Sequence, residues 1–285
     1  MSIQYNINDP RTPIVIIVGP ASSGKSMVLV RIAKYLNDHG YSVKADRSYI
    51  NTEKYQKDCD EFEKHLNISA GEGGGIAMPG SVTDLLVEVR DSKKNKICQF
   101  LEAPGEDYFS ASNPNRDVPP YLQTICGGGV RNRKCFVLLL DLDSCPENDK
   151  GVAQLQFRFR NNRDLRNQYI ERITDRILRD IRRKQDRFIL LYNKVDIPGF
   201  GSTTECSNEN GARKEALDLY GRLFESDKLQ RKWMGFFTLP NFTFLPFCTG
   251  SYAARPDDEG KMIKQYNPSD DIYPQRLWAE IVRRF

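Results

Sequence analysis

The sequence predicts an α/β fold with three layers, in which helices cover both faces of a mostly parallel sheet of six strands. Short apolar runs rich in Ile, Val, Leu and Phe recur along the chain without alternation. Such runs are typical of strands that are buried on both faces of a parallel sheet. Helical patterns separate several of these runs, and alternating strands and helices predict βαβ units with right-handed crossovers.

The expected elements follow from these patterns in chain order. The six strands are Ile14–Val18, Leu85–Arg90, Ile97–Glu102, Cys135–Leu140, Phe188–Tyr192 and Thr243–Phe247. The main helices are Ser26–Asn37, Asp164–Gln185 and Pro274–Phe285. In the second helix Leu165, Tyr169 and Ile173 recur at every fourth position, which predicts one apolar face directed toward the core.

The length of 285 residues favours one enlarged domain, because it exceeds the usual size of about 100–200 residues without reaching two full domains. We therefore expect a single domain over residues 1–285. Three segments are longer than ordinary connections and are predicted insertions: Tyr41–Met78, Ser144–Asn162 and Gly199–Trp233. The first should contain a short helix near Glu53–Leu66, followed by a glycine-rich stretch of the kind that forms lids or binding loops.

Composition narrows the class of protein. Lys and Arg number 42 against 38 Asp and Glu, a bias too small to indicate nucleic acid as a partner. Seven cysteines without a CxxC pair predict neither a disulfide framework nor a zinc site, which favours a reducing cytoplasm. Ser2 replaces the glycine that myristoylation needs, and the apolar runs are far shorter than the roughly 20 residues of a membrane span, so we expect no membrane anchor.

The strongest motif lies between the first predicted strand and the first predicted helix. It consists of Gly19-Pro20-Ala21-Ser22-Ser23-Gly24-Lys25-Ser26 and satisfies the pattern G-x-x-x-x-G-K-[ST]. Its glycines let the loop curl so that successive N–H groups converge on phosphate oxygens, and the helix that follows adds its positive end. Lys25 would reach the β- and γ-phosphates, and the Ser26 hydroxyl would bind Mg²⁺. The structural alternative is an ordinary glycine-rich turn.

A second motif follows the strand Phe188–Tyr192 and indicates which nucleotide base would be bound. It consists of Asn193-Lys194-Val195-Asp196 and matches the pattern N-K-x-D. The Asp196 carboxylate can accept two parallel hydrogen bonds from guanine, whereas adenine has no N1–H to donate. Asn193 would steady the loop and meet the edge of the base, and the stem of Lys194 would pack on its face. Alone, the four residues are also compatible with a polar turn after a strand.

With both motifs in this order, the chain resembles the translation-factor-related class of P-loop GTPases, which includes the Ras-like and Arf-like small GTPases. Its proportions are similar to those of bacterial GTPases with enlarged loops that work beside partner proteins. The resemblance implies a D-x-x-G motif, which corresponds here to Glu102-Ala103-Pro104-Gly105. Glu102 replaces the aspartate that supports Mg²⁺ through water. Gly105 is retained at the position whose N–H binds the γ-phosphate in relatives.

The remaining motifs of the family match this sequence less closely. Glu106 stands where many relatives have a glutamine that orients the attacking water, so its role in hydrolysis is a hypothesis. A switch hydroxyl that closes on Mg²⁺ and γ-phosphate is implied at Thr83, with Ser81 as the alternative. The last motif, which contacts the guanine carbonyl, corresponds to Thr249-Gly250-Ser251, with Gly250 at its middle position.

These residues predict a GTPase that hydrolyses Mg²⁺·GTP to GDP and phosphate as a molecular switch, through a protein effector or an activating partner. Glu102 and Glu106 leave a second interpretation open, a GTP-binding module with little or no turnover. An ATP-dependent enzyme that shares only the phosphate-binding loop is the third interpretation.

Overall fold

A computed structural model describes most of the chain. The described residues are 5–7, 9–20, 23–67, 84–110, 113–140, 162–181, 185–196, 199–233, 237–256 and 262–285. Within them, a seven-stranded sheet has the order β2-β3-β4-β1-β5-β6-β9. Its strands are β1 (Ile14–Val18), β2 (Ser42–Ala45), β3 (Leu85–Arg90), β4 (Lys96–Glu102), β5 (Lys134–Leu140), β6 (Arg187–Tyr192) and β9 (Phe242–Pro246).

The sheet is mostly parallel, as the apolar runs predicted. β4, β1, β5, β6 and β9 pair in parallel, whereas β2 and β3 run antiparallel to their neighbours. The expected number of six strands is wrong, because the edge strand β2 was not predicted. β2 has only four residues, and two of them are at least partly exposed. A short half-exposed edge strand does not produce the continuous apolar run by which the other six were recognised.

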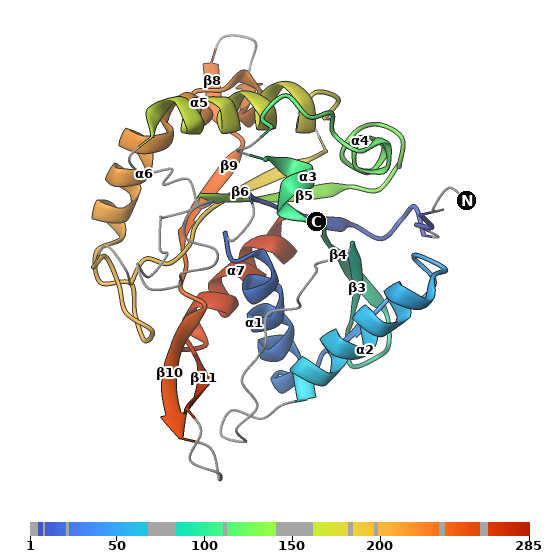
Figure 1. Ribbon diagram of the computed structural model, residues 1–285. Helices are drawn as coiled ribbons and strands as arrows, with labels where there is room; N and C mark the ends of the chain where they lie inside the picture. The colour runs from blue at the N-terminus through green and yellow to red at the C-terminus, as the bar shows by residue number, and fades with distance from the viewer. Residues whose placement is uncertain are drawn as a thin grey trace.

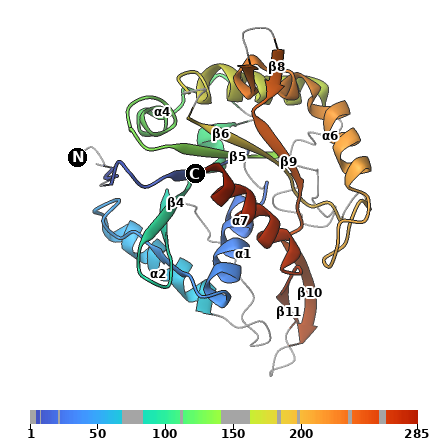
Figure 2. The same ribbon diagram turned by 180° about the vertical axis from the view of Figure 1, so that it is seen from behind.

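Helices cover both faces of this sheet (Figures 1 and 2). They are α1 (Lys25–Asp38), α2 (Glu53–Asn67), α3 (Gly105–Tyr108), α4 (Pro120–Cys126), α5 (Arg163–Arg172), α6 (Glu209–Phe224) and α7 (Ile272–Arg284), with a π-helical turn η2 (Ile173–Ile177) and a 3₁₀ turn η3 (Asp227–Leu229). α1, α2 and α7 lie on one face, and α4, α5 and α6 lie on the other. The three-layer α/β arrangement predicted from the sequence is thus confirmed.

The long helix expected over Asp164–Gln185 ends earlier than predicted. α5 continues into η2, where the N–H of Leu178 bonds to the carbonyl of Ile173, and regular helical geometry stops at Leu178. A π-helical turn widens the helix by one residue and shifts its apolar face.

The predicted insertions are only partly described. Tyr41–Met78 contains β2 and α2, whereas Ser144–Asn162 lies outside the described residues except for Asn162. Gly199–Trp233 contains α6, which makes the crossover that parallel strands β6 and β9 require. This segment is therefore partly a structural connection.

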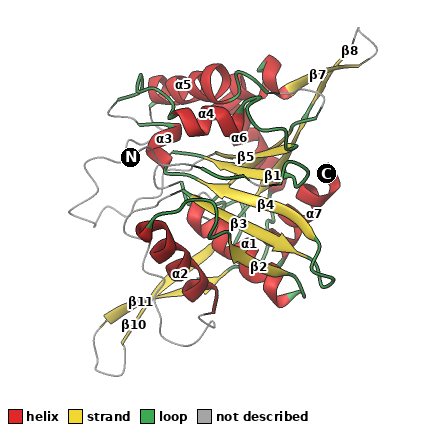
Figure 3. Cartoon of the chain, turned by 90° about the vertical axis from the view of Figure 1, so that its right-hand side faces the viewer, coloured by secondary structure: helices red, strands yellow, loops and turns green. Residues whose placement is uncertain are grey.

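Two antiparallel ribbons extend from the sheet in opposite directions (Figure 3). The ribbon formed by β7 (Gln230–Trp233) and β8 (Phe237–Pro240) precedes β9. The ribbon formed by β10 (Gly250–Pro256) and β11 (Met262–Pro268) follows it and leads into α7.

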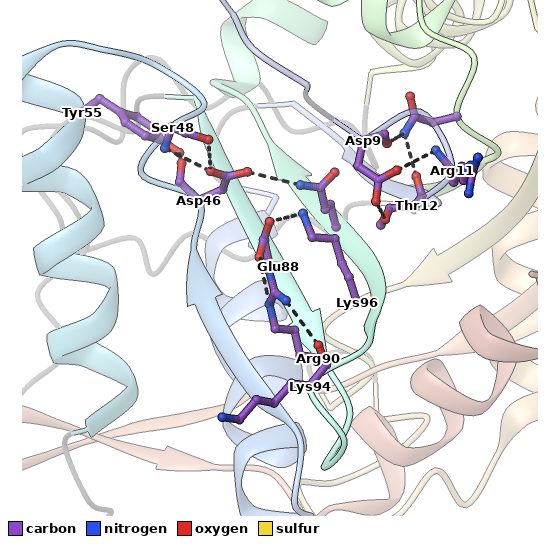
Figure 4. Close-up of polar contacts among 12 residues, drawn as sticks. Asp9, Arg11, Thr12, Asp46, Ser48, Tyr55, Glu88, Arg90, Lys94 and Lys96 are labelled. Carbon is purple, nitrogen blue, oxygen red and sulfur yellow. Dashed lines mark hydrogen bonds and ion pairs between the residues drawn. The ribbon is translucent and has the colours of Figure 1, made fainter.

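Polar contacts hold the antiparallel side of the sheet (Figure 4). Glu88 on β3 bonds both Arg90 and Lys96, and the latter pair crosses to β4. Asp46, directly after β2, accepts from Ser48 at 2.6 Å, and its backbone carbonyl accepts from the Tyr55 hydroxyl at 2.8 Å. These contacts fix α2 and the edge strand on the parallel core.

Candidate functional site

The two motifs predicted from the sequence meet at one edge of the sheet. Parallel strands end at the same edge, and open α/β sheets bind ligands just beyond these carboxyl ends. Gly19 follows β1, Ala103 follows β4, Asn193 follows β6, and Phe247 follows β9. The candidate site is therefore assembled from connections that the sheet holds in fixed order.

The predicted phosphate-binding loop has a glycine in the backbone conformation that its motif favours. Gly24 adopts a φ of +89°, in the left-handed region that favours glycine, and directly precedes α1. A Cβ on Gly19 would lie 2.6 Å from Ser23 Oγ and 3.1 Å from Leu139 Cβ, so a larger residue would require these side chains to shift. Ala21 and Ser22 lie outside the described residues.

Lys25 and Ser26 open α1 and contact groups on either side of the loop. The Lys25 ammonium is buried and donates to the carbonyl of Pro20 at 3.1 Å, so it curls back over the loop. The Ser26 hydroxyl donates to a carboxylate oxygen of Glu102, the last residue of β4. Burial raises the pKa of Glu102, while the Ser26 hydrogen bond and the Lys25 charge oppose that rise.

These two oxygen donors suit a hydrated Mg²⁺. Magnesium keeps several water ligands and is usually held by one or two protein oxygens together with substrate phosphates. Ser26 and Glu102 bring a hydroxyl and a carboxylate into direct contact beside the predicted phosphate-binding loop. The third predicted metal ligand, Thr83, lies outside the described residues.

The second motif is bonded directly to the first. The Asn193 side-chain amide donates to the carbonyl of Ser23 at 3.1 Å, and both residues are fully buried. Asn193 Oδ1 and Ser23 Oγ are also buried, and neither has a hydrogen-bond partner within the described part of the chain. Unpaired buried polar atoms are uncommon, and here they lie where the two predicted ligand-binding motifs touch.

Backbone and side-chain bonds join the second motif to the loop after β9. Val195 N–H donates to the Phe247 carbonyl at 3.2 Å, and Lys194 between the motif's ends takes a positive φ of 60°. Cys248 Sγ donates to Asp196 Oδ1 at 3.4 Å. Burial, then the charge of Asp196, raise the pKa of Cys248 to about 12, so the thiol keeps its proton and remains a donor.

The last predicted motif, Thr249-Gly250-Ser251, contacts the residues at the end of the second ribbon, which are in turn bonded to α1. Gly250 has a φ of +129°, and a Cβ there would lie 2.2 Å from the Asn267 carbonyl, so this position requires glycine. Thr249 O accepts from Ser269 N–H at 3.1 Å. Arg31 on α1, itself buried, donates to the carbonyl of Ser269 at 2.6 Å.

On the opposite side, the residues after β4 begin a short helix. Gly105 is buried as the first residue of α3, and Glu106 beside it is exposed to solvent. Arg172 at the end of α5 donates to the backbone carbonyls of Tyr108 at 2.6 Å and of Arg116. Glu102, Gly105 and Glu106 thus remain near one another on one connection, which is anchored from α5.

Two groups at this edge were not recognised in the sequence. Cys248 is a lone cysteine after a strand, and only its position relative to Asp196 could have indicated a role. The second group joins Asp84, Asp107 and Tyr121 through the Tyr121 hydroxyl. These residues come from three separate segments, so no local spacing reveals their contact.

Comparisons with known proteins show a likeness in structure alone. No protein-family model and no curated protein sequence matches this chain. Nucleolar GTP-binding protein 1 of Plasmodium falciparum is 13% identical, with a TM-score of 0.39 over 85% of this chain and 79% of the other. The signal recognition particle receptor SRb-GTP/SRX complex from Chaetomium thermophilum is 13% identical, with a TM-score of 0.44 over 96% and 99%.

The GTPase-like domain of S. cerevisiae Ski7, bound to GDP and inorganic phosphate, is 14% identical with a TM-score of 0.43. The match covers 96% of this chain and 50% of that one. At such low identities and TM-scores, no ligand or activity carries over to the present protein. Among its described residues, no helix is both long and apolar enough to cross a membrane.

Proposed function

We propose that the protein binds guanine nucleotide together with Mg²⁺ and hydrolyses GTP to GDP and phosphate as a molecular switch. The observation that carries this proposal is the bond from Asn193 to the Ser23 carbonyl. It joins a loop suited to phosphates with a motif suited to guanine, at the edge of the sheet where ligands bind.

The phosphate end would use the backbone of Gly19–Ser26 and the ammonium of Lys25. Lys25 already lies over the loop through its bond to Pro20, so a phosphate oxygen would replace a carbonyl as its acceptor. Ser26, Glu102 and Thr83 would hold the hydrated Mg²⁺, which neutralises charge on the β- and γ-phosphates when bound. Gly105 would offer its N–H to the γ-phosphate.

The base end would use Asp196 as the acceptor for guanine, with Lys194 packed on the face of the base. Cys248 directs its proton at Asp196 Oδ1 and so orients the carboxylate. The unpaired Oδ1 atom of Asn193 is available to a donor on the ligand. Thr249 and Gly250 would complete the pocket on the guanine carbonyl side.

Hydrolysis would depend on Glu106, which we propose as the residue that positions the attacking water. It is exposed on α3, two peptide units beyond Pro104 and next to Gly105. An exposed carboxylate can accept a hydrogen bond from water without further rearrangement. An activating or effector protein is the partner that such a switch requires.

A GTP-binding module with little turnover is the second candidate. The observation that favours it is the direct bond between Ser26 and Glu102, since the longer acid reaches the hydroxyl that Mg²⁺ would bind. Such a module would bind guanine nucleotide through the same residues but would release it unchanged. Single-turnover hydrolysis of radiolabelled GTP separates the two candidates.

Titration of the purified chain with GTP, GDP and ATP, with and without Mg²⁺, tests the proposed function. We expect the wild type to prefer guanine nucleotides, and Asp196→Ala to lower the preference for GTP over ATP by on the order of 10⁴-fold, because buried donors would be left unpaired. Asp218→Ala, on the exposed side of α6, is the matched control and should change nothing. Equal affinity of the wild type for ATP and GTP would instead indicate an ATP-dependent enzyme.

A further inference from the structure

We propose that Tyr121 is a positioning residue that joins the two segments facing the γ-phosphate, and that it thereby sets both the preference for GTP over GDP and the rate of hydrolysis. This inference rests on the proposed function. It concerns residues that neither nucleotide-binding motif contains. The observation that motivates it is a single hydroxyl bonded to two carboxylates from different segments.

The geometry of this contact is compact. Tyr121 lies near the start of α4 and directs its hydroxyl at Asp84 Oδ1 and, at 2.8 Å, at Asp107 Oδ2. Tyr5 adds its own hydroxyl to Asp84 Oδ2 at 3.3 Å. The rings of Tyr5 and Tyr121 stack with centroids 4.2 Å apart, which fixes the plane in which the Tyr121 hydroxyl lies. We call Tyr5, Asp84, Asp107 and Tyr121 the tyrosine–aspartate cluster.

The two aspartates belong to the segments that would surround the γ-phosphate. Asp84 directly follows Thr83 in the sequence and precedes Leu85, which pairs with Glu102 across β3 and β4. Asp107 is in α3, directly after Glu106. The tyrosine–aspartate cluster therefore connects the neighbour of the proposed switch hydroxyl with the neighbour of the residue proposed to position water.

The chemistry of the contact makes this connection depend on one atom. A phenol carries one proton, which it donates to one carboxylate at a time. Two carboxylates that share one hydrogen-bond donor repel each other when that donor is removed. Loss of the hydroxyl would leave two acids facing each other and would drive the segments apart.

Other contacts fix the rest of α3 and leave Tyr121 as the described link to Asp84. Arg116 pairs with Asp107 at 3.4 Å, and Arg172 donates to the carbonyl of Tyr108 at 2.6 Å. Arg172 thus joins α3 to α5, and Arg116 joins α3 to the loop that follows it. Neither contact reaches β3. Among the described residues, side-chain hydrogen bonds between α3 and Asp84 run through the tyrosine–aspartate cluster, in addition to the backbone pairing of Leu85 with Glu102.

The test uses Tyr121→Phe in the full chain, because this variant keeps the ring and its stacking on Tyr5 and removes only the hydroxyl. We expect affinity for GDP to stay unchanged, since GDP lacks the γ-phosphate. Affinity for a non-hydrolysable GTP analogue and the single-turnover rate of hydrolysis should each fall by about tenfold, the loss of one hydrogen bond to a charged group. Tyr5→Phe is the matched control, because its hydroxyl bonds Asp84 alone, and its effect should be distinctly smaller.

Two further measurements separate positioning from general destabilisation. Tyr121→Phe combined with Asp107→Asn should be no worse than Tyr121→Phe alone, because the second change removes the repulsion that the first creates. Amide hydrogen exchange of the nucleotide-free protein should accelerate in residues 84–90 and 105–110 together, while exchange in α1 stays unchanged.

The outcomes are distinguishable. Loss of GDP binding in step with the GTP analogue, or wild-type rates and analogue affinity in Tyr121→Phe, would overturn the positioning role. If the wild type binds no guanine nucleotide, the proposed function fails. In that case exchange that rises in only one of the two segments, or in neither, would also show that Tyr121 does not join them.

Discussion

The two sides of the candidate site are built differently. On the side proposed for the base, the Asn193 side chain bonds the proposed phosphate-binding loop, and Val195 bonds the loop after β9 through the backbone. On the γ-phosphate side, α3 is held by side chains that reach it from other elements, namely Tyr121 from α4 and Arg172 from α5. The first side thus has a backbone bond between adjacent connections in addition to its side-chain contacts, whereas the contacts that other helices make with α3 on the second side come from side chains.

This difference separates binding from turnover. Backbone hydrogen bonds between adjacent strand ends persist as long as the sheet is folded, so the base side should be formed before nucleotide arrives. Side-chain contacts can be exchanged one at a time when the γ-phosphate is lost. A segment that alternates between two conformations requires such exchangeable contacts. We therefore expect changes on the base side to alter affinity for every guanine nucleotide, and changes on the γ-phosphate side to alter GTP alone.

Among the changes that test this comparison, the largest effect is expected from Gly24→Ala, which lies where the two motifs are in contact. A Cβ on Gly24 would lie 2.7 Å from Asn193 Nδ2, the atom that bonds Ser23, and the φ of +89° disfavours any other residue. We expect the affinities for GDP and GTP to fall together by about 100-fold, as isothermal titration would measure. This loss corresponds to a backbone strain of about 1–3 kcal/mol in the nucleotide-bound state.

Gly40→Ala provides a matched control for this prediction. Gly40 has a similar φ of +82°, but nothing lies within 4 Å of a Cβ placed there. The control should lose stability in urea unfolding from the same backbone strain while retaining its nucleotide affinity. Equal loss of affinity in both variants would show that strain, and not the contact with Asn193, accounts for the effect.

The difference between the two sides also decides what the sequence could reveal. Gly19–Ser26 and Asn193–Asp196 are contiguous motifs whose residue types follow from the ligand, and six of seven strands have continuous apolar runs. The edge strand β2 was missed because it is short and half exposed. The contact among Asp84, Asp107 and Tyr121 was missed because it joins residues up to 37 positions apart, and such proximity is set by packing.

Helix α6 illustrates the same limit within the fold. Its segment was predicted to be an insertion because it is longer than an ordinary connection, yet Ala212, Ala216 and Tyr220 are buried at a spacing of four residues. Asn208 accepts from Gly211 N–H at 2.9 Å and provides a helix N-cap that the sequence does display. Small buried residues give a weak hydrophobic signal, so tertiary packing was needed to recognise the helix.

A smaller effect is expected from Glu106→Ala, which tests the γ-phosphate side. The single-turnover rate of GTP hydrolysis should fall by about tenfold, below the usual contribution of a proton acceptor, because Glu106 is exposed and water can partly replace it. Affinity for GDP should stay unchanged. Glu225→Ala, an exposed acid at the end of α6, is the control. A hydrolysis rate identical to that of the wild type would remove the proposed role of Glu106.

The smallest effect is expected from Cys248→Ala on the base side. A thiol is a weak donor, and its bond to Asp196 spans 3.4 Å, so affinity for GDP and GTP should fall together by about threefold, while Cys248→Ser should retain a donor and bind as the wild type does. A loss confined to GTP would contradict the division between the two sides.

The same thiol also reports on its neighbour through its reactivity with iodoacetamide. Burial and the charge of Asp196 raise the pKa of Cys248 to about 12, so at about pH 7 to 9 the thiolate is a minute fraction and alkylation should be slow. Because the raised pKa favours the protonated thiol, raising the pH through this range should increase the alkylation rate without reaching a plateau. Asp196→Ala should lower the pKa and accelerate alkylation at each pH, as mass spectrometry of the Cys248 peptide would show. An unchanged rate would mean that the thiol and the carboxylate do not interact, and Cys248 would then have no part in orienting the acceptor for guanine.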